Sequence, residues 1–410
     1  MRFPFVCVSF AVAAPLAAQS TWSVPVLETA LNSTAADSGP HLSFDGLTLH
    51  FASFRSGNWE IYTSTRAAPG ATWAVPTAVV ELADVGTDDQ PFLAATGLEL
   101  FFASTRTGGA GGFDILRSTR ASPAVPWSVP TFVTELNSAG SESSFSMTAD
   151  GLEAFFLTTG WGAPSAPNNA IFRATRTSPA LPFGPPTLVT ELANANTHRD
   201  CEISADGLSI VYTEFVSPRL KVFHATRPDR VTPFAPPVVW TEFDTVGAVT
   251  GVFSFTRAVD GGEALLAAGF ATAAGGQEIM TTRRSVPYGL GCGAPAALAL
   301  ACTAPVIGAS WSFTTSAIDP VSPVAVTFFG LTETAIPLDP LGAIGCTALV
   351  DNLLTSLAAA NVGGSAVISV AVPANPALAG FALKAQSVCL TLGNALGLYA
   401  SNAVKGTLGP

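Results

Sequence analysis

The stretch LSFDGLTLHFASFRSGNWEIYTSTR (residues 42–66) holds an Asp-Gly pair between two apolar runs and ends on an arginine. On both sides of the pair, apolar and polar residues alternate, which is the period of a β-strand with one buried face. Asp45-Gly46 is a strong hairpin signal because glycine tolerates the positive φ of a tight turn. The stretch therefore predicts a β-hairpin followed by a further strand.

The same features recur five times in constant order. An aromatic residue opens each unit at intervals of 51 to 56 residues, at Trp22, Trp73, Trp127, Phe183 and Phe234. The tight turn begins at Asp45, Thr96, Asp150, Asp206 and Asp260. An arginine closes each unit at Arg66, Arg120, Arg176, Arg227 and Arg283. Repeats of this length, built from short alternating segments, indicate four-stranded sheets arranged around an axis.

We therefore predict an all-β fold in which residues 20–286 form a five-bladed β-propeller. The repeats begin with an outer-strand segment (residues 22–29) and end with the three inner strands of a unit (residues 249–283). The first segment should complete the last blade, because this pairing closes the ring and removes its open edges. Residues 22–29 are thus expected to pair antiparallel with the strand that ends near Arg283.

The segments PHLSFDGLTLHFASFR (residues 40–55) and IYTSTR (residues 61–66) resemble the WD40-like repeat of TolB-type β-propellers. The resemblance extends over residues 20 to about 285. It is strongest in the first two units, although Thr96 replaces the turn aspartate in the second, and later units lose the Ser-x-Arg ending. Because members of this family are mostly binding or scaffold propellers, the resemblance implies a recognition role.

The repetition also assigns a role to Asp45. A catalytic residue is needed once, whereas this aspartate occurs in four of the five units. Asp side chains hydrogen-bond the backbone of their own turn, so a turn-capping role is predicted. By the same argument, the five repeated arginines are predicted to stabilise the blades.

Positions that differ between units are the candidates for function. Eight residues before each turn, at the expected start of the innermost strand, are Asp37, Asp88, Glu142, His198 and Val252, with Asp89, Arg199, Asp200 and Glu202 beside them. Three interpretations remain open. The groups could cap the start of each strand, or Asp37, Asp88 and Glu142 could bind calcium. Alternatively, His198 and a carboxylate could serve a small-molecule or sugar site as an acid/base pair.

Two further residues complete the predicted ligand site. Asp200 lies next to the acidic positions, and Trp161 sits in a longer, unit-specific loop where an indole could stack on a ligand. The familiar metalloprotease, hydrolase and phosphate-binding motifs are missing from the sequence. No cofactor is predicted apart from the calcium interpretation.

Composition and the N-terminus predict the compartment. Residues 1–19 have a basic start, an apolar core and small residues at the end, as in a secretory signal peptide, and no later run is long and apolar enough to span a membrane. The net charge of -11 excludes a nucleic-acid partner. We expect a protein secreted to the extracellular space or cell surface.

The repeats stop after Arg284, and residues 287–410 are predicted to form a small β-sandwich. Residues 347–361 have leucines at helical spacing and could form one short helix. Four cysteines lie in this part, namely Cys292, Cys302, Cys346 and Cys389. In an oxidising compartment they are expected to form two disulfides, and spacing alone leaves three pairings open.

The landmarks YGLGC, PLGAIGC and VPANPALAGFALKAQ resemble a C-terminal β-sandwich module of exported bacterial proteins of uncertain function. The resemblance implies the pairs Cys292–Cys346 and Cys302–Cys389, and a role in sorting, attachment, adhesion or stabilisation. For the whole chain, the leading prediction is non-catalytic binding of a protein or polysaccharide partner through the propeller. The alternative is a propeller glycoside hydrolase or lyase that uses channel-mouth carboxylates. The oligomeric state is not predicted.

Overall fold

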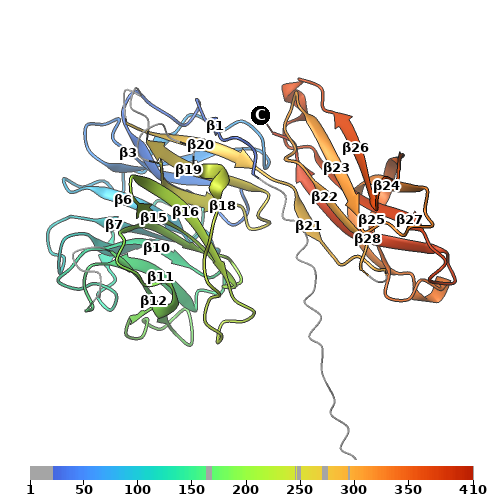
Figure 1. The fold of residues 1–410 in the computed structure, drawn as a ribbon. Coiled ribbons are helices and arrows are strands. Elements are labelled where there is room, and N and C mark those ends of the chain that lie inside the picture. The colour runs from blue at the N-terminus through green and yellow to red at the C-terminus, as the bar shows by residue number, and fades with distance from the viewer. Residues whose placement is uncertain are drawn as a thin grey trace, which may run out of the picture.

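The computed structural model describes residues 22–162, 169–244, 246, 251–269, 276–293 and 296–409. These residues form the predicted all-β protein, with a propeller followed by a sandwich (Figure 1). The expected signal peptide, residues 1–19, lies outside the described residues. Within the described residues, no helix is long and apolar enough to span a membrane.

The propeller consists of four-stranded antiparallel units. Three are separate sheets, β2 (Asp37–Leu42) to β5 (Thr77–Ala78), β6 (Asp88–Leu93) to β9 (Thr131–Phe132), and β10 (Glu142–Met147) to β13 (Thr187–Leu188). Their middle strands are β3 (Thr48–Ser53), β4 (Glu60–Thr65), β7 (Glu99–Ser104), β8 (Asp114–Thr119), β11 (Glu153–Thr158) and β12 (Ala170–Thr175).

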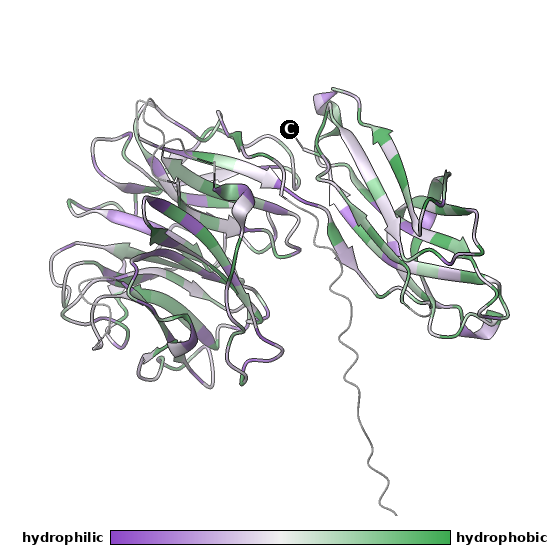
Figure 2. Cartoon of the chain, viewed as in Figure 1, coloured by the Kyte–Doolittle hydropathy of each residue, from purple (hydrophilic) through white to green (hydrophobic). Residues whose placement is uncertain are grey.

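Two further units are joined through a single parallel pair, Leu220 with Gly251. One contains β14 (His198–Ile203), β15 (Ser209–Val216), β16 (Arg219–Thr226) and β17 (Val238–Val239). The other contains β18 (Gly251–Arg257), β19 (Glu263–Gly269), β20 (Gln277–Arg283) and β1 (Val26–Leu27). The 3-10 helices η1 (Thr190–Leu192) and η2 (Thr241–Phe243) follow β13 and β17. Apolar side chains from neighbouring sheets pack between the blades, and Figure 2 shows hydrophobic residues running along the strands.

The predicted ring closure is confirmed. β1, from the start of the described chain, pairs antiparallel with β20, with Val26 opposite Thr281 and Leu27 opposite Met280 (Figure 1). Trp22 is 5% exposed and contacts Trp240, Phe243 and Phe255. The last blade is therefore completed by the first strand of the chain.

One arginine in each unit lies over the aromatic anchor that comes just before the fourth strand of the same blade. The guanidinium carbon is 4.2 to 4.6 Å from the ring centroid in the pairs Arg66–Trp73, Arg120–Trp127, Arg176–Phe183, Arg227–Phe234 and Arg284–Trp22. The Nε of each arginine donates to the carbonyl of the turn glycine, at Gly46, Gly97, Gly151, Gly207 and Gly261. The stabilising role predicted for the arginines is thus confirmed for four of the five.

The fifth arginine, Arg283, also stabilises the blades but through another contact, because the repeated position over the anchor belongs to Arg284. In every unit the arginine over the anchor directly follows the third strand, and β20 extends through Arg283, so Arg284 takes this position. Arg283 instead donates to Glu263 at 2.7 Å. Because Arg283 and Arg284 are adjacent, the sequence pattern did not distinguish them. The length of β20 shows that Arg284 is the repeated arginine.

The turn-capping role of the aspartates is confirmed. Asp45 Oδ1 accepts from Ser43 Oγ at 2.6 Å and from the Leu47 amide at 2.9 Å. Asp150 and Asp206 repeat both contacts. Gly46 has a φ of 72°, as the hairpin requires. Asp45 is therefore a structural residue of the repeat.

The sandwich packs a five-stranded sheet, in the order β21-β28-β27-β24-β25, on a three-stranded sheet, β22-β23-β26. The strands are β21 (Val286–Tyr288), β22 (Ala299–Cys302), β23 (Ser310–Ser316), β24 (Val324–Pro337), β25 (Thr347–Ala360), β26 (Ser365–Ala371), β27 (Ala382–Leu390) and β28 (Leu398–Thr407). The 3-10 helices η3 (Asp339–Leu341) and η4 (Pro376–Leu378) lie in connections. The helix predicted for residues 347–361 is wrong, because this segment forms β25 and pairs along its length with β24. Long-range strand pairing outweighs the local leucine spacing.

The disulfide Cys292–Cys346 is present, as the resemblance implied. The second expected disulfide is wrong, since Cys302 and Cys389 are both free and buried. Cys302 lies on β22 and packs with Trp311 and Phe313, whereas Cys389 lies on β27 of the other sheet, in a separate apolar cluster. The two thiols therefore serve as small core residues.

Replacing Trp22 by alanine should lower the free energy of unfolding by about 3–5 kcal/mol, because a buried indole that closes the ring is lost. Trp161→Ala is the matched control, since that indole is 40% exposed, and a change below about 1 kcal/mol is expected. Chemical denaturation monitored by circular dichroism measures both. Equal losses in the two variants would contradict the closure role of Trp22.

Candidate functional site

The predicted candidates do begin the innermost strands, but they do not line an open channel mouth. Asp37, Asp88, Glu142 and His198 are the first residues of β2, β6, β10 and β14, and each is 0% exposed. They lie at the ends of these strands opposite to the Asp-Gly turns. We call the side of the propeller that carries the turns the turn face.

Asp37 and Asp88 are each held by an arginine of their own blade. Arg55 donates to Asp37 Oδ1 at 2.7 Å, and Arg106 donates to both oxygens of Asp88 at 2.9 Å. The same guanidinium groups also donate to the carbonyls of Leu31 and Leu82. These ion pairs tie the innermost strand to the second strand and to the segment before it.

Glu142 and His198 make the equivalent contacts with other partners. Glu142 Oε1 accepts from Ser138 Oγ and from Thr158 Oγ1, both at 2.6 Å. His198 Nε2 is 3.6 Å from Glu214 Oε2, and its Nδ1 is 3.0 Å from the Asn169 carbonyl oxygen. Burial lowers the pKa of His198. All four candidates are thus paired inside the blades, as the strand-capping interpretation expects.

Calcium binding by Asp37, Asp88 and Glu142 stays a prediction. Across the described parts of the chain, no group of three or more His, Cys, Asp or Glu side chains is arranged to hold a metal ion. Asp37, Asp88 and Glu142 belong to three different blades and point to separate partners. The structure does not bring these carboxylates together.

Asp200 occupies the narrow centre of the propeller. The innermost strands carry β-bulges here, and Gln90 and Ser144 have positive φ angles of 49° and 48°. Asp200 accepts from Ser144 Oγ and from the Phe255 amide, both at 2.8 Å, which links three blades. Burial raises the pKa of Asp200 to about 7 and that of Asp89 to about 6.

Trp161 lies in the loop after β11, at the end away from the turns. Its indole N–H donates to the Leu136 carbonyl at 3.0 Å, and the side chain is 40% exposed. Residues 163–168 of the same loop lie outside the described residues. The stacking role of Trp161 stays a prediction.

Two clefts lie on the turn face, and of the predicted candidates only Glu202 lines them. A cleft of about 380 Å³ lies between the propeller and the sandwich, and one of about 160 Å³ opens at the mouth of the central channel. Both are lined by Phe44, Ala258, Val259 and Asp260. The two clefts therefore adjoin each other along these residues, and we call them together the turn-face groove.

Charged side chains line the channel end of this groove. His41 Nδ1 is 3.8 Å from Glu202 Oε2, and the Arg257 amide donates to Glu202 Oε1 at 3.1 Å. Arg257 also donates to the side chain and carbonyl oxygens of Ser209. These groups come from the first, fourth and fifth blades, so only the closed ring brings them together.

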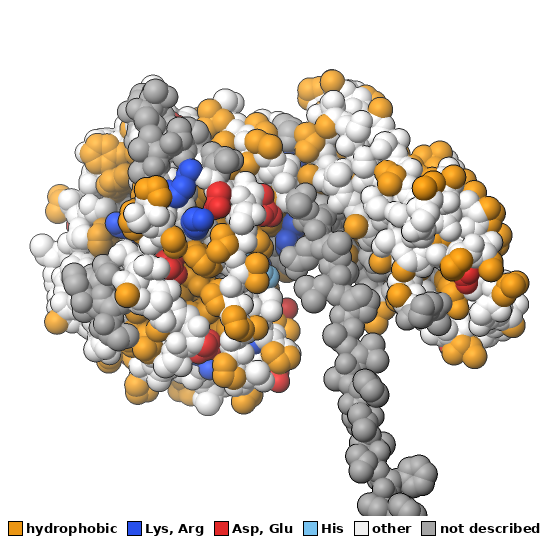
Figure 3. Space-filling view, viewed as in Figure 1, with side chains coloured by type: hydrophobic (Ala, Val, Ile, Leu, Met, Phe, Trp, Pro, Cys, Tyr) orange, Lys and Arg blue, Asp and Glu red, His pale blue; other side chains and the backbone are white. Residues whose placement is uncertain are grey.

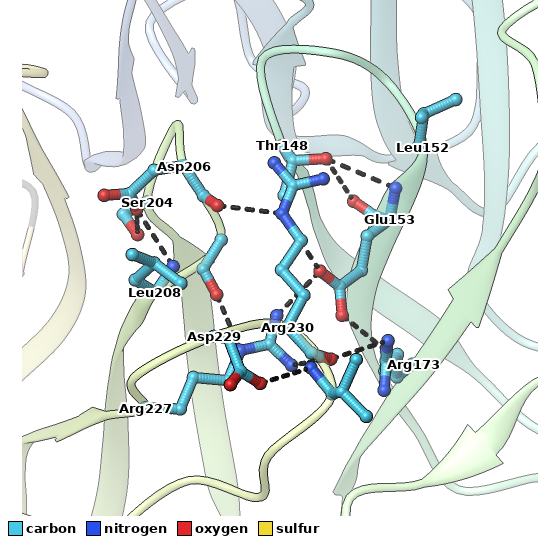
Figure 4. Close-up of polar contacts among 12 residues, drawn as sticks. Thr148, Leu152, Glu153, Arg173, Ser204, Asp206, Leu208, Arg227, Asp229 and Arg230 are labelled. Atoms are coloured by element: carbon cyan, nitrogen blue, oxygen red, sulfur yellow. Dashed lines mark hydrogen bonds and ion pairs between the residues drawn. The ribbon is translucent and has the colours of Figure 1, made fainter.

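Arginine–glutamate contacts join neighbouring blades, and one of them lines the groove. Glu263 accepts from Arg66 of the first blade and from Arg283 of its own blade. Burial alone would raise the pKa of Glu263, but the two guanidinium groups reverse this and lower it. Glu153 is held in the same way by Arg173 and Arg227, with Arg230 beside them (Figure 4). These buried carboxylates brace neighbouring blades.

The groove could not be predicted from the sequence of a single repeat. Its lining combines turn residues of the first and last blades with β27 and β28 of the sandwich. The available signal was the glutamate at the start of the second strand in three units, Glu99, Glu153 and Glu263, where the other units have Thr48 and Ser209. Glu153 and Glu263 indicate where neighbouring blades are braced, whereas Glu99 pairs with Arg117 of its own blade, and none of the three indicates where a cleft stays open.

Comparison with known proteins finds matches among solved structures and in neither of the two sequence comparisons. No protein-family model and no curated protein sequence matches the chain. Among solved structures, TolB from Acinetobacter baumannii is 16% identical with a TM-score of 0.39, and the match covers 62% of this chain and 56% of that one. The chain thus spans about half of that relative's length.

Two glycoside hydrolases are also similar in structure. A GH62 hydrolase crystallised with xylotriose is 10% identical, with a TM-score of 0.42 and coverage of 65% of this chain and 97% of that one. Zg3597 from Zobellia galactanivorans, a family 117 hydrolase, is 9% identical, with a TM-score of 0.42 and coverage of 65% and 90%. With TM-scores below 0.5, these similarities do not distinguish binding from catalysis.

Replacing Asp88 by alanine should destabilise the protein by about 3 kcal/mol or more, because it leaves Arg106 without its buried counter-charge. Asp244→Ala is the control, since its ion pair with Lys221 at 3.3 Å is partly exposed and should contribute about 1 kcal/mol or less. Thermal melts with calcium and with chelator complete the test. A wild-type midpoint that rises with calcium, and no longer does so in Asp88→Ala, would contradict a purely structural role.

Asp200→Asn should change how stability depends on pH. The folded-state pKa of Asp200, about 7, lies above the value of about 4 expected in the unfolded chain. Its contribution is therefore present below pH 4 and is lost as the pH rises from about 4 to about 7. Urea unfolding at pH 5 and pH 8 should show a loss that is smaller in the variant by about 2 kcal/mol. Identical pH profiles would contradict the assigned pKa.

Proposed function

We propose that this is an exported, non-catalytic recognition protein that binds a chain-like ligand, a polysaccharide or a protein segment, along the turn-face groove. The observation that carries the proposal is that the two clefts of this groove adjoin each other and together extend from the channel mouth to the sandwich. Adjoining clefts that share lining residues suit an extended polymer better than a compact substrate. The repeat's resemblance to TolB-type propellers, which mostly serve in binding or scaffolding, agrees with this role.

The side chains of the groove suit recognition. Phe44 is partly exposed and packs edge-on against Phe92, so one face of its ring can contact a sugar or an apolar side chain. Val259 is 57% exposed, and Asp45 and Asp260 are exposed beside it. Apolar contacts flanked by a few polar groups are typical of ligand sites.

The acidic residues that begin the innermost strands are already paired, and this supports a role without catalysis. Asp37, Asp88 and Glu142 are buried and hydrogen-bonded within the blades, so a substrate in the groove would not reach them. The proposal of export rests on the expected signal peptide and on the disulfide Cys292–Cys346, which favours an oxidising compartment.

A propeller glycoside hydrolase or lyase is the second candidate. It is favoured by Asp200, because a carboxyl group with a pKa of about 7 is suited to proton transfer near neutral pH. Two features oppose a hydrolase or lyase. The channel around Asp200 is narrow, and hydrogen bonds from Ser144 and Phe255 already occupy both carboxyl oxygens.

The test is a binding and turnover assay of residues 20–410 with soluble polysaccharides and an unstructured peptide library. Val259→Asp should weaken binding of any ligand found by about tenfold, because it places a charge and extra bulk in the groove. Val85→Asp is the control, since Val85 is 94% exposed and does not line the groove. Cleavage products that disappear in Asp200→Asn would favour the hydrolase. Binding that Val259→Asp leaves intact would refute the groove as the site.

A further inference from the structure

The sandwich has an unusual charge distribution. Between Val286 and Pro410 the sequence contains six charged residues, Asp319, Glu333, Asp339, Asp351, Lys384 and Lys405. Figure 3 shows the visible face of the sandwich as mainly uncharged atoms, in contrast to the blue and red groups on the propeller. The two lysines are the only cationic side chains of this part, and the whole chain has one other lysine, Lys221.

Both cationic side chains lie at the same place. Lys384 on β27 is the direct cross-strand partner of Lys405 on β28, and both line the cleft between the sandwich and the propeller. Like charges that stand directly opposite each other on neighbouring strands destabilise a sheet. Placing the two lysines apart would remove this repulsion, so their juxtaposition indicates a site for negative charge.

The contacts within the sandwich leave both ammonium groups able to bind a ligand. Lys384 Nζ donates to the Leu331 carbonyl at 2.9 Å, and Lys405 Nζ is 3.3 Å from Glu333 Oε1. An ammonium group has three N–H donors, so each lysine retains donors for an anion. The Glu333 side chain is 44% exposed, and an exposed ion pair of this kind is weak enough for a ligand to displace.

The propeller side of the cleft has the opposite character. Asp45 and Asp260 are exposed there, and each uses Oδ1 to cap its turn. In the described part of the chain, no ion pair within 4 Å joins Lys384 or Lys405 to these carboxylates. A ligand in the cleft would therefore meet ammonium donors on one wall and carboxylate acceptors on the other.

We propose that this cleft is a subsite for an anionic polysaccharide, with Lys384 and Lys405 binding a carboxylate or sulfate group of the sugar. Sugar hydroxyl groups would donate to Asp45 and Asp260 on the facing wall. An acidic peptide fits less well, because Asp45 and Asp260 would repel its carboxylate side chains, which carry no hydroxyl groups to donate. The inference rests on the proposed binding function and names its ligand class.

The test compares polygalacturonate with its methyl ester and with dextran, using residues 20–410 and isothermal titration calorimetry. Polygalacturonate should bind about tenfold more tightly than its methyl ester, and added salt should reduce this difference. Sulfated dextran as a fourth probe separates a sulfate site from a carboxylate site. Lys384→Ala/Lys405→Ala should lower the affinity for the anionic polymer by about tenfold or more.

Two further variants make the test specific. Lys221→Ala removes the remaining lysine, which pairs with Asp244 outside the cleft, and should change the affinity less than about twofold. Glu333→Gln removes the competing carboxylate beside Lys405 and should increase the affinity severalfold. A gain of binding of this kind does not arise from damage to the fold.

Any of four outcomes would overturn the inference. The first is equal affinity for polygalacturonate and its methyl ester. The second is unchanged affinity in Lys384→Ala/Lys405→Ala, and the third is a marked fall in its melting temperature, which would make the lysines a domain brace. A ligand whose binding depends on Val259 but not on the two lysines would leave the proposed function intact. No binding of any of the four polymers would refute the anionic-polysaccharide site, whereas failure of the wider ligand panel would refute the proposed function as well.

Discussion

The propeller depends on one contact, an arginine guanidinium lying over an aromatic ring at every blade junction. Each such contact contributes about 1 kcal/mol or more when it is shielded from water. Its Nε also fixes the turn glycine of the same blade, so one side chain sets both the third strand and the hairpin. At the last junction Arg284 lies over Trp22, and the contact that orders each blade also closes the ring.

Because the repeat uses its charged residues in this way, few of them are left for chemistry. The arginines cover aromatic rings, the turn aspartates cap backbone amides, and Glu153 and Glu263 brace neighbouring blades. Even the acidic residues that differ between units, such as Asp37 and Asp88, are consumed by ion pairs inside a blade. The groups that remain accessible lie where blades meet each other and the sandwich, and there the turn-face groove is found.

Prediction from sequence succeeded where the determinant is local and repeated. The Asp-Gly turns, the alternation of the strands and the order of the units required no knowledge of distant contacts. It misplaced the repeated arginine at Arg283, because two adjacent arginines satisfy the same pattern, and it failed at residues 347–361, where pairing with β24 outweighs leucine spacing. For Cys302 and Cys389, the separation of the two sheets decided against a bond that a cysteine count allows.

By itself, the sequence determined the class of fold, the number and order of the repeats, and the structural role of the repeated turn aspartates, because each of these follows from periodicity and short-range hydrogen bonding. Only the tertiary structure decided which candidates face solvent and which surfaces form a groove. Burial of Glu142 and His198 depends on neighbouring strands and loops that surround them, and Lys384 meets Lys405 only through the β27–β28 register. Which side chains are exposed, and which ones meet, depends on how distant segments pack, so no single segment contains this information.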